Sequence, residues 1–145
     1  MRKRSATTVG ATLAAAALSM VLTPAASADP VYGYEIDYGT TGGSRGDCVR
    51  IFTDRMSMCF QDYGDVFWVK DDWADGRSAV VRWKNYRDGI LYREGECRNS
   101  SGAGTWVKCN KNFYEGSDIW YQGGFRDLDA GGGFIDELGS YTATA

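Results

Sequence analysis

The chain has 145 residues, with 16 Lys and Arg against 19 Asp and Glu, and it contains no histidine. A protein without a basic excess lacks the electrostatic surface that binds nucleic acid or anionic lipid, so we expect neither as a partner. The absence of histidine excludes hydrolases that activate a nucleophile through a Ser-His or Cys-His pair.

The N-terminal 28 residues have the pattern of a secretory signal peptide. Positively charged residues 2–4 precede an uncharged run rich in alanine and leucine at 5–22, and Ala-Ser-Ala follows at 26–28. We therefore expect cleavage before Asp29 and a secreted, extracellular protein. The mature chain, residues 29–145, would form a single β domain with 13 Lys and Arg against 19 Asp and Glu, a net charge of 13 − 19 = −6.

Four cysteines in the mature chain predict two disulfide bonds. They are Cys48, Cys59, Cys97 and Cys109. An even number of cysteines in an exported chain is typical of disulfide bonding, and four cysteines allow three connectivities. Ten or more residues separate neighbouring cysteines. Zinc sites need closer ligands or histidine, so we expect no zinc site.

A hairpin with a two-residue turn at 53–54 would place Cys48 opposite Cys59, at a separation that a disulfide can bridge. By the same logic, strands near 90–99 and 105–110 would face each other and join Cys97 to Cys109. One face of the first hairpin would carry the apolar side chains of Val49, Ile51, Met56, Met58 and Phe60.

A second turn, at 63–64, would set Phe60 opposite Phe67 and Met58 opposite Val69. No segment of the mature chain has a helical period, and apolar, β-branched and aromatic runs recur at short intervals. We predict an all-β fold: a small antiparallel sandwich or partly closed barrel of about six to eight strands with two disulfides. Further strands are expected at 32–36, 78–83, 90–93, 96–99, 105–110 and 134–138, with a flexible loop at 39–46.

Asp71, Asp72 and Asp75 raise the question of a calcium site. The helix-loop-helix calcium motif needs a ligand at its third position and a glutamate at its twelfth, where this chain has Trp73 and Arg82. An ordinary turn that ends at glycine is therefore favoured, and the later run at 127–131 fails in the same way. We expect no metal and no cofactor.

Two segments resemble small exported proteins of actinobacteria: CFQDYGDVFWVKDDWADGRSAVVRW at 59–83 and CRNSSGAGTWVKCN at 97–110. The resemblance implies secretion and a compact, disulfide-stapled all-β fold, and it brings no catalytic residues. A shorter segment, DGRSAV at 75–80, looks like part of the secreted metalloprotease inhibitors of the crystallin-like type. Those inhibitors carry a compact Cys-Leu-Tyr signature that is absent here.

A non-catalytic binding or interaction module is the function that we expect. Small disulfide-stapled β scaffolds present loops to a partner, and exposed aromatic residues anchor proteins or stack on sugars. The candidate ligand contacts are Trp73 in a polar turn and the adjacent pair Trp120 and Tyr121. The expected partner of this monomer is an extracellular protein or a glycan.

Three other functions stay open. They are a secreted protease inhibitor, a carbohydrate-binding or carboxylate-dependent glycosidase-like protein, and a structural envelope protein without a discrete ligand. Glycoside hydrolysis needs only two acidic residues, but these acids are more often solubilising surface charges. The candidates are Asp71, Asp72, Asp75, Glu94 and Glu96.

Overall fold

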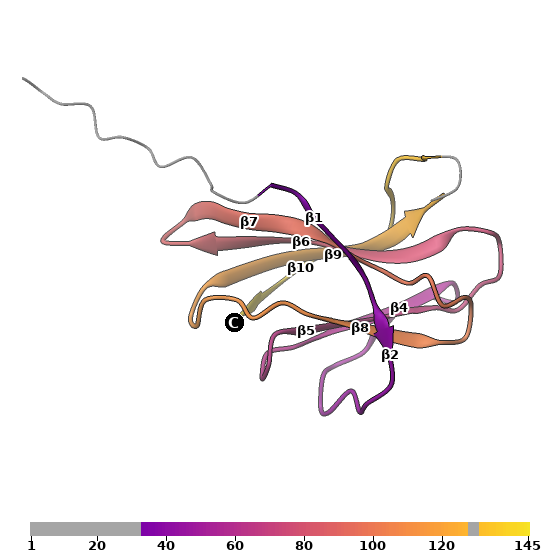
Figure 1. Cartoon of the computed structure of the whole chain (residues 1–145), viewed down its shortest axis with the longest axis horizontal. Helices are drawn as coiled ribbons and strands as arrows, with labels where there is room; N and C mark the ends of the chain where they lie inside the picture. The colour runs from indigo at the N-terminus through magenta and orange to yellow at the C-terminus, as the bar shows by residue number, and fades with distance from the viewer. Residues whose placement is uncertain (1–32, 128–130) are drawn as a thin grey trace, which may run out of the picture.

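The computed structural model describes residues 33–127 and 131–145 (Figure 1). The predicted signal peptide at 1–28, its cleavage point before Asp29 and the start of the first expected strand lie outside these residues. Within the two described ranges, no helix is long and apolar enough to cross a membrane. The strands are β1 (Glu35–Tyr38), β2 (Thr40–Thr41), β3 (Ile51–Phe52), β4 (Met56–Gln61), β5 (Val66–Asp71), β6 (Ser78–Arg87), β7 (Ile90–Arg98), β8 (Trp106–Asn110), β9 (Asp118–Arg126) and β10 (Ile135–Thr144).

These strands form two five-stranded sheets, which confirms the all-β prediction and favours the sandwich over a barrel. Sheet A has the order β1-β7-β6-β9-β10, and sheet B has the order β2-β8-β5-β4-β3. The described chain has ten strands rather than about six to eight, and two of them, β2 and β3, are only two residues long. β1 runs parallel to β7, and the other strand pairs are antiparallel.

Aromatic rings fill the core between the sheets. The predicted pairing of Phe60 with Phe67 and of Met58 with Val69 is confirmed. The centroid of the Phe67 ring lies 4.8 Å from that of Phe60 and 6.5 Å from that of Trp83. Each such side chain stabilises the fold by about 1.5–3 kcal/mol through burial. Other core residues are Ala79, Val81, Ile119, Tyr121 and Phe125.

The hairpin of β3 and β4 has a longer turn than the sequence predicted. Phe52 pairs with Ser57 rather than with Arg55, so the turn contains four residues. Thr53 explains this length, because its hydroxyl accepts hydrogen bonds from two backbone N–H groups of the turn, at 3.2 and 3.4 Å. The ladder ends before Val49, which was expected on the core face and is instead 81% exposed.

Both predicted disulfide pairs are present. The Cα atoms of Cys48 and Cys59 are 5.8 Å apart. The placement of Cys97 and Cys109 differs from the prediction, because β7 belongs to sheet A and β8 to sheet B. This second bond joins the two sheets instead of closing a hairpin. Two disulfides are typical of a protein that folds in an oxidising environment.

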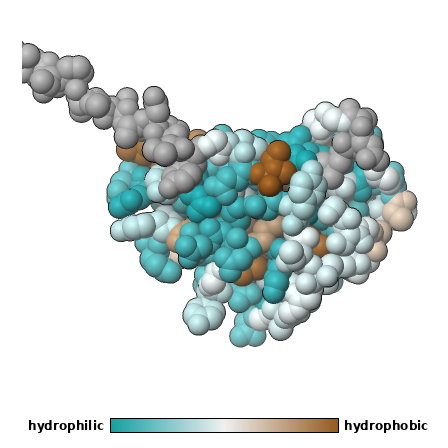
Figure 2. Space-filling model, viewed as in Figure 1, coloured by the Kyte–Doolittle hydropathy of each residue, from teal (hydrophilic) through white to brown (hydrophobic). Residues whose placement is uncertain are grey.

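The two lateral edges of the sandwich are built differently. At one, which we call the crossing edge, the chain passes from β1 in sheet A to β2 in sheet B (Figure 1). Figure 2 shows that the surface on this side is mostly hydrophilic. At the opposite side, which we call the open edge, β10 borders sheet A and β3 borders sheet B, with a groove beside them.

Candidate functional site

Two glycines let the chain cross between the sheets. Gly95 lies in β7 beside Glu35 of β1, and a Cβ atom there would overlap the carbonyl oxygen of Glu35 and lie 2.9 Å from Cζ2 of Trp83. Gly39 follows β1, and a Cβ atom there would lie 2.8 Å from Cβ of Val107. A side chain at either position would push β1 away from its neighbours, so the crossing depends on glycine.

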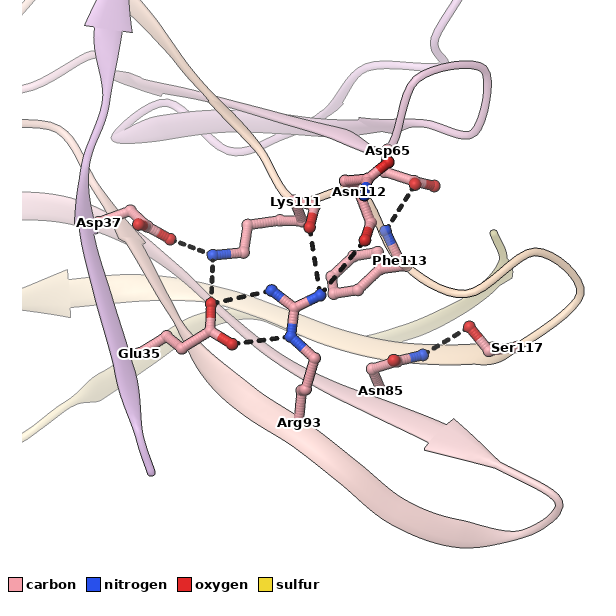
Figure 3. A network of polar contacts seen from close by, with 9 residues as sticks. All are labelled: Glu35, Asp37, Asp65, Asn85, Arg93, Lys111, Asn112, Phe113 and Ser117. Carbon is pink, nitrogen blue, oxygen red and sulfur yellow. Dashed lines mark hydrogen bonds and ion pairs between the residues drawn. The ribbon is translucent and has the colours of Figure 1, made fainter. Parts of the chain in front are cut away.

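Four charged side chains meet where β1 crosses (Figure 3). Arg93 of β7 donates from Nε to Glu35 Oε1 at 2.8 Å and from Nη2 to Oε2 at 3.1 Å. Its Nη1 donates to the carbonyl oxygens of Lys111, at 3.2 Å, and Asn112, at 3.4 Å. Lys111 Nζ donates to Glu35 Oε2 at 2.7 Å and also to Asp37. The network ties β1 and β7 of sheet A to the segment that follows β8 of sheet B.

The two cations of the network are largely withdrawn from solvent, whereas the side chains of Glu35 and Asp37 are 26% and 40% exposed, and the four charges balance. The side chain of Lys111 is only 4% exposed, and its Nζ lies 4.7 Å from the centroid of the Trp83 ring. The side chain of Arg93 is 17% exposed and lies against the ring of Phe113. Two cations and two carboxylates sum to zero, which is the condition under which buried charges persist without a large energetic penalty.

Glu35 stays ionised at neutral pH because of this arrangement. Burial by itself would raise the pKa of Glu35, but hydrogen bonds and positive charge from Arg93 and Lys111 outweigh it and lower the pKa below its ordinary value. The carboxylate therefore serves as a fixed hydrogen-bond acceptor. It is not suited to donate a proton.

Polar contacts hold the connection between β8 and β9, residues 111–117, in one shape. Asp65 Oδ2 accepts a hydrogen bond from the N–H of Phe113 at 2.6 Å, and burial raises the pKa of Asp65. At the other end, Asn85 Nδ2 donates to Ser117 Oγ at 2.7 Å (Figure 3). Immediately before Phe113, the backbone has a φ of 47° at position 112, where asparagine is tolerated better than most residues. Side chains in this connection are thus presented from a pinned backbone.

A pocket of about 430 Å³ opens beside the network, and we call it the Arg93 pocket. One part of its lining is aromatic: Tyr114 is 54% exposed, and the Arg87 guanidinium lies over its ring, with Cζ 4.0 Å from the ring centroid. The other part is polar and comes from the network and from an exposed asparagine. The pocket is lined by Glu35, Tyr92, Arg93, Lys111, Asn112, Phe113 and Tyr114.

The aromatic residues that the sequence singled out lie elsewhere and are not brought together. Trp73 is 53% exposed in the turn after β5. Trp120 is partly exposed on the outer face of sheet A, 5.7 Å from Lys84 Nζ, and lines a separate depression of about 600 Å³. Tyr121 is only 7% exposed and belongs to the core. The two neighbours point in opposite directions because β9 is a strand.

Asp71, Asp72 and Asp75 are each engaged by different groups of the protein. Asp71 is buried and accepts a hydrogen bond from the N–H of Trp73, and burial raises its pKa. Asp72 binds Lys70 Nζ at 2.6 Å. Asp75 binds Arg55 at 3.0 Å. Among the residues that the structure describes, no group of three or more acidic, cysteine or histidine side chains could hold a metal ion.

The other two acidic candidates lie on the outer face of sheet A. Glu94 is opposite Lys84 in the ladder of β6 and β7. Glu96 is fully buried, where it binds Arg98, accepts from Arg126 Nε at 2.8 Å and accepts from the Tyr34 hydroxyl at 3.1 Å. Each oxygen of Glu96 is therefore already bound by the protein.

Sequence reasoning missed the Arg93 pocket. Glu35 and Arg93 are 58 positions apart, and Glu35 and Lys111 are 76 apart, so no local pattern connects them. The available signal was the run of residues 111–117, where two adjacent aromatic residues stand in an otherwise polar connection.

Comparison with protein family models, curated proteins and solved structures found no match for this chain. The resemblance noted in the sequence is therefore supported only as an all-β fold with two disulfides. The candidate site has to be interpreted from its own chemistry.

Proposed function

We propose that this protein is a secreted, non-catalytic module that binds a neutral sugar residue of an extracellular glycan in the Arg93 pocket. One observation carries the proposal. The pocket combines exposed aromatic surface with charged groups whose charges already balance.

The balanced network disfavours an ionic ligand. Both cations of the pocket are bound to Glu35, so an anion would have to take the place of this partner and leave the Glu35 carboxylate unpaired. A neutral ligand with hydroxyl groups needs only hydrogen bonds. The charge balance therefore favours uncharged polar ligands.

Sugars offer hydroxyl groups together with apolar C–H faces, and the pocket supplies a partner for each. The Tyr114 ring provides an apolar face, and its hydroxyl adds a polar tip. The Asn112 amide both donates and accepts hydrogen bonds, which matches the bonding of a hydroxyl group. Because the connection that carries both side chains is pinned, little conformational entropy is lost on binding.

The pocket does not suit carboxylate-dependent glycoside hydrolysis. That reaction needs one acid that remains protonated near neutral pH, through a raised pKa. Glu35 has a lowered pKa, and Asp37 is bound to Lys111. Neither carboxylate fits the role of a general acid.

We infer that this binding takes place outside the cell. The signal sequence and the two disulfides support a secreted domain. The net charge of 13 − 19 = −6 after cleavage argues against nucleic acid and anionic membranes as partners. We propose a monomer, with one Arg93 pocket per chain.

The proposal is tested by calorimetric titration of the mature protein with neutral glucan and chitin oligosaccharides. Tyr114→Ala should weaken binding by about tenfold, which corresponds to about 1.4 kcal/mol. Asn112→Gly should also weaken it, and this change suits the positive φ at that position, so folding is preserved. Tyr63→Ala is the matched control, because Tyr63 is 87% exposed and does not line the pocket.

Salt separates the classes of ligand. Binding of a neutral sugar should change little with ionic strength, whereas an anionic ligand would lose affinity as salt screens the cations. Failure of all neutral oligosaccharides to bind, or equal loss of binding in the Tyr114 and Tyr63 variants, would contradict the proposal.

A further inference from the structure

A second candidate surface lies at the open edge and shares no lining residue with the Arg93 pocket. It consists of the free side of β10 at residues 140–144 and the groove beside it, a cavity of about 630 Å³ that we call the β10 groove. Its lining includes Val49, Ile51, Phe60, Tyr141 and Ala143, which are apolar or aromatic, and Asp47 and Asp62 at the rim.

The backbone of β10 offers unused hydrogen-bonding groups. Among the strands that the structure describes, β9 is its one neighbour in sheet A. The N–H of Ala145 donates to Ser117 O at 3.0 Å, so residue 145 bonds toward the β9 side. Because bonding alternates along an antiparallel pair, the N–H and C=O groups of Thr142 and Thr144 point to the free side. An added strand on this side could form hydrogen bonds with these backbone groups.

The usual protection of an edge strand is confined to the first half of β10. That half carries Asp136 and Glu137 and a register shift before Ser140, with Gly139 at a φ of 70°. Glu137 is held across the edge by Arg55, at 3.1 Å. The second half, residues 140–144, has no charge and no proline, and it is rich in β-forming residues.

The groove is matched to an extended chain. A strand paired with β10 directs every second side chain to the side on which Tyr141 and Ala143 lie, which is the side of the groove. Val49, 81% exposed, stands at this groove and offers apolar contact to such a side chain.

Charge selects the partner. The carboxylates of Asp47 and Asp62 are exposed at the groove, and neither is in an ion pair with any residue that the structure describes. A second copy of this chain would bring two more such carboxylates to the same place. A basic segment of another protein would be attracted to them.

We propose that the β10 groove binds an extended peptide segment of a partner protein, by strand addition to residues 140–144. The segment carries small apolar side chains at alternate positions, with lysine or arginine beside them to meet Asp47 and Asp62. This site is independent of the Arg93 pocket.

The test is titration of the full mature protein with three synthetic, blocked peptides, followed by calorimetry and by amide chemical shifts. The first has the sequence Lys-Val-Thr-Val-Thr-Lys. The second peptide has glutamate in place of both lysines, and the third has proline in place of the second valine. We expect the first to bind and to shift the amides of residues 140–144, the second to bind at least about tenfold more weakly, and the third not to bind.

Variants of the protein separate pairing from folding. Thr142→Pro removes an N–H that faces the free side, so it should abolish peptide binding while the melting temperature changes little. Asp47→Asn with Asp62→Asn should weaken binding several-fold, whereas Asp54→Asn with Asp88→Asn, an equal change of exposed charge away from the groove, should leave it unaltered.

Three outcomes would overturn the proposal. Equal binding of the basic and acidic peptides, or no binding of any of the three, would exclude the stated partner. A dimer in light scattering that Thr142→Pro converts to monomer would assign the edge to a second copy of the chain instead. The sugar-binding result for the Tyr114 variant does not affect these results. The proposal for the β10 groove and the proposal for the Arg93 pocket are therefore tested separately.

Discussion

The crossing edge and the open edge of the sandwich show two ways to end a pair of stacked sheets. At the crossing edge, the continuous chain from β1 to β2, the bond between Cys97 and Cys109, and the network around Glu35 all join sheet A to sheet B. At the open edge, the contact of Arg55 and Thr53 with Glu137 spans the sheets, and the β10 groove lies beyond it.

The two edges therefore suit different kinds of partner. A small domain that concentrates its cross-links at one edge can leave the other edge available for a partner, because local stability need not be uniform. The same cross-links make the Arg93 pocket rigid, which suits a small ligand, whereas the open edge retains free backbone groups, which suit a strand. Four changes would break or sharpen this comparison.

The largest effect is expected from the disulfides. Cys97→Ser with Cys109→Ser should lower the free energy of unfolding by about 3–5 kcal/mol, and Cys48→Ser with Cys59→Ser by about 2–3 kcal/mol. The sequence separations are 12 and 11 residues, so loop entropy is nearly equal, and the difference reflects the bond that joins the sheets inside the core. Urea denaturation followed by tryptophan fluorescence measures both, and an equal or reversed loss would contradict the comparison.

Glu35→Gln should cost about 2 kcal/mol of stability at neutral pH, somewhat less than the loss from breaking a fully buried pair, because Glu35 is 26% exposed. The change removes one of the two carboxylates of the network, so that of these two only Asp37 remains to balance Arg93 and Lys111.

The cost should depend on pH in a defined direction. The pKa of Glu35 is lower in the folded protein than in the unfolded chain, so the carboxylate stabilises the fold above its unfolded pKa, and this contribution is lost as pH falls through the folded value. The gap between wild type and Glu35→Gln should therefore stay constant down to about pH 5 and close as the pH falls below the ordinary glutamate value of 4.5. The stability of the two proteins is compared between about pH 7 and about pH 2. A constant gap across this range would show that the glutamate acts through packing alone.

Gly95→Ala should destabilise the crossing edge by about 1–3 kcal/mol, because the new methyl group would overlap the backbone oxygen of Glu35. Gly123→Ala is the control, since the atoms nearest to its Cβ are the ends of the flexible Met58 and Leu138 side chains. Thermal unfolding by circular dichroism should rank the Gly95 variant below the Gly123 variant. The reverse order would mean that β1 shifts without cost.

The smallest effect belongs to the open edge. Glu137→Gln should cost less than about 1 kcal/mol, because its partner Arg55 is 30% exposed and the pair is screened by salt. Compared with Glu35→Gln, this is the same chemical change at the opposite edge. High salt should remove the small Glu137 effect on stability and leave most of the Glu35 effect. Denaturation of both variants at low and at high salt measures this difference. Equal losses at the two edges would remove the contrast between them.

Much of the fold followed from local pattern. The alternation of apolar side chains predicted the all-β class, the register of β4 with β5, and the strand that carries Ala79, Val81 and Trp83. The cysteine pairing also followed, since spacing and export favoured it. The prediction extended the ladder of β3 as far as Val49, which was wrong. The hydrogen bond from the N–H of Arg55 to the Thr53 hydroxyl, which shapes the turn, gives no periodic signal in the sequence.

What the chain by itself determined was its all-β class, most of its strands and its sulfur pairs, because these depend on period, count and composition. The prediction missed β9 and the short β2. The tertiary structure alone decided that β7 and β8 belong to different sheets, so that the bond between Cys97 and Cys109 joins layers instead of neighbours. It also decided that Glu35, Arg93 and Lys111 share one pocket. The physical reason is that side-chain alternation specifies which face of a strand is buried, whereas the choice of neighbouring strand depends on contacts between residues far apart in the chain.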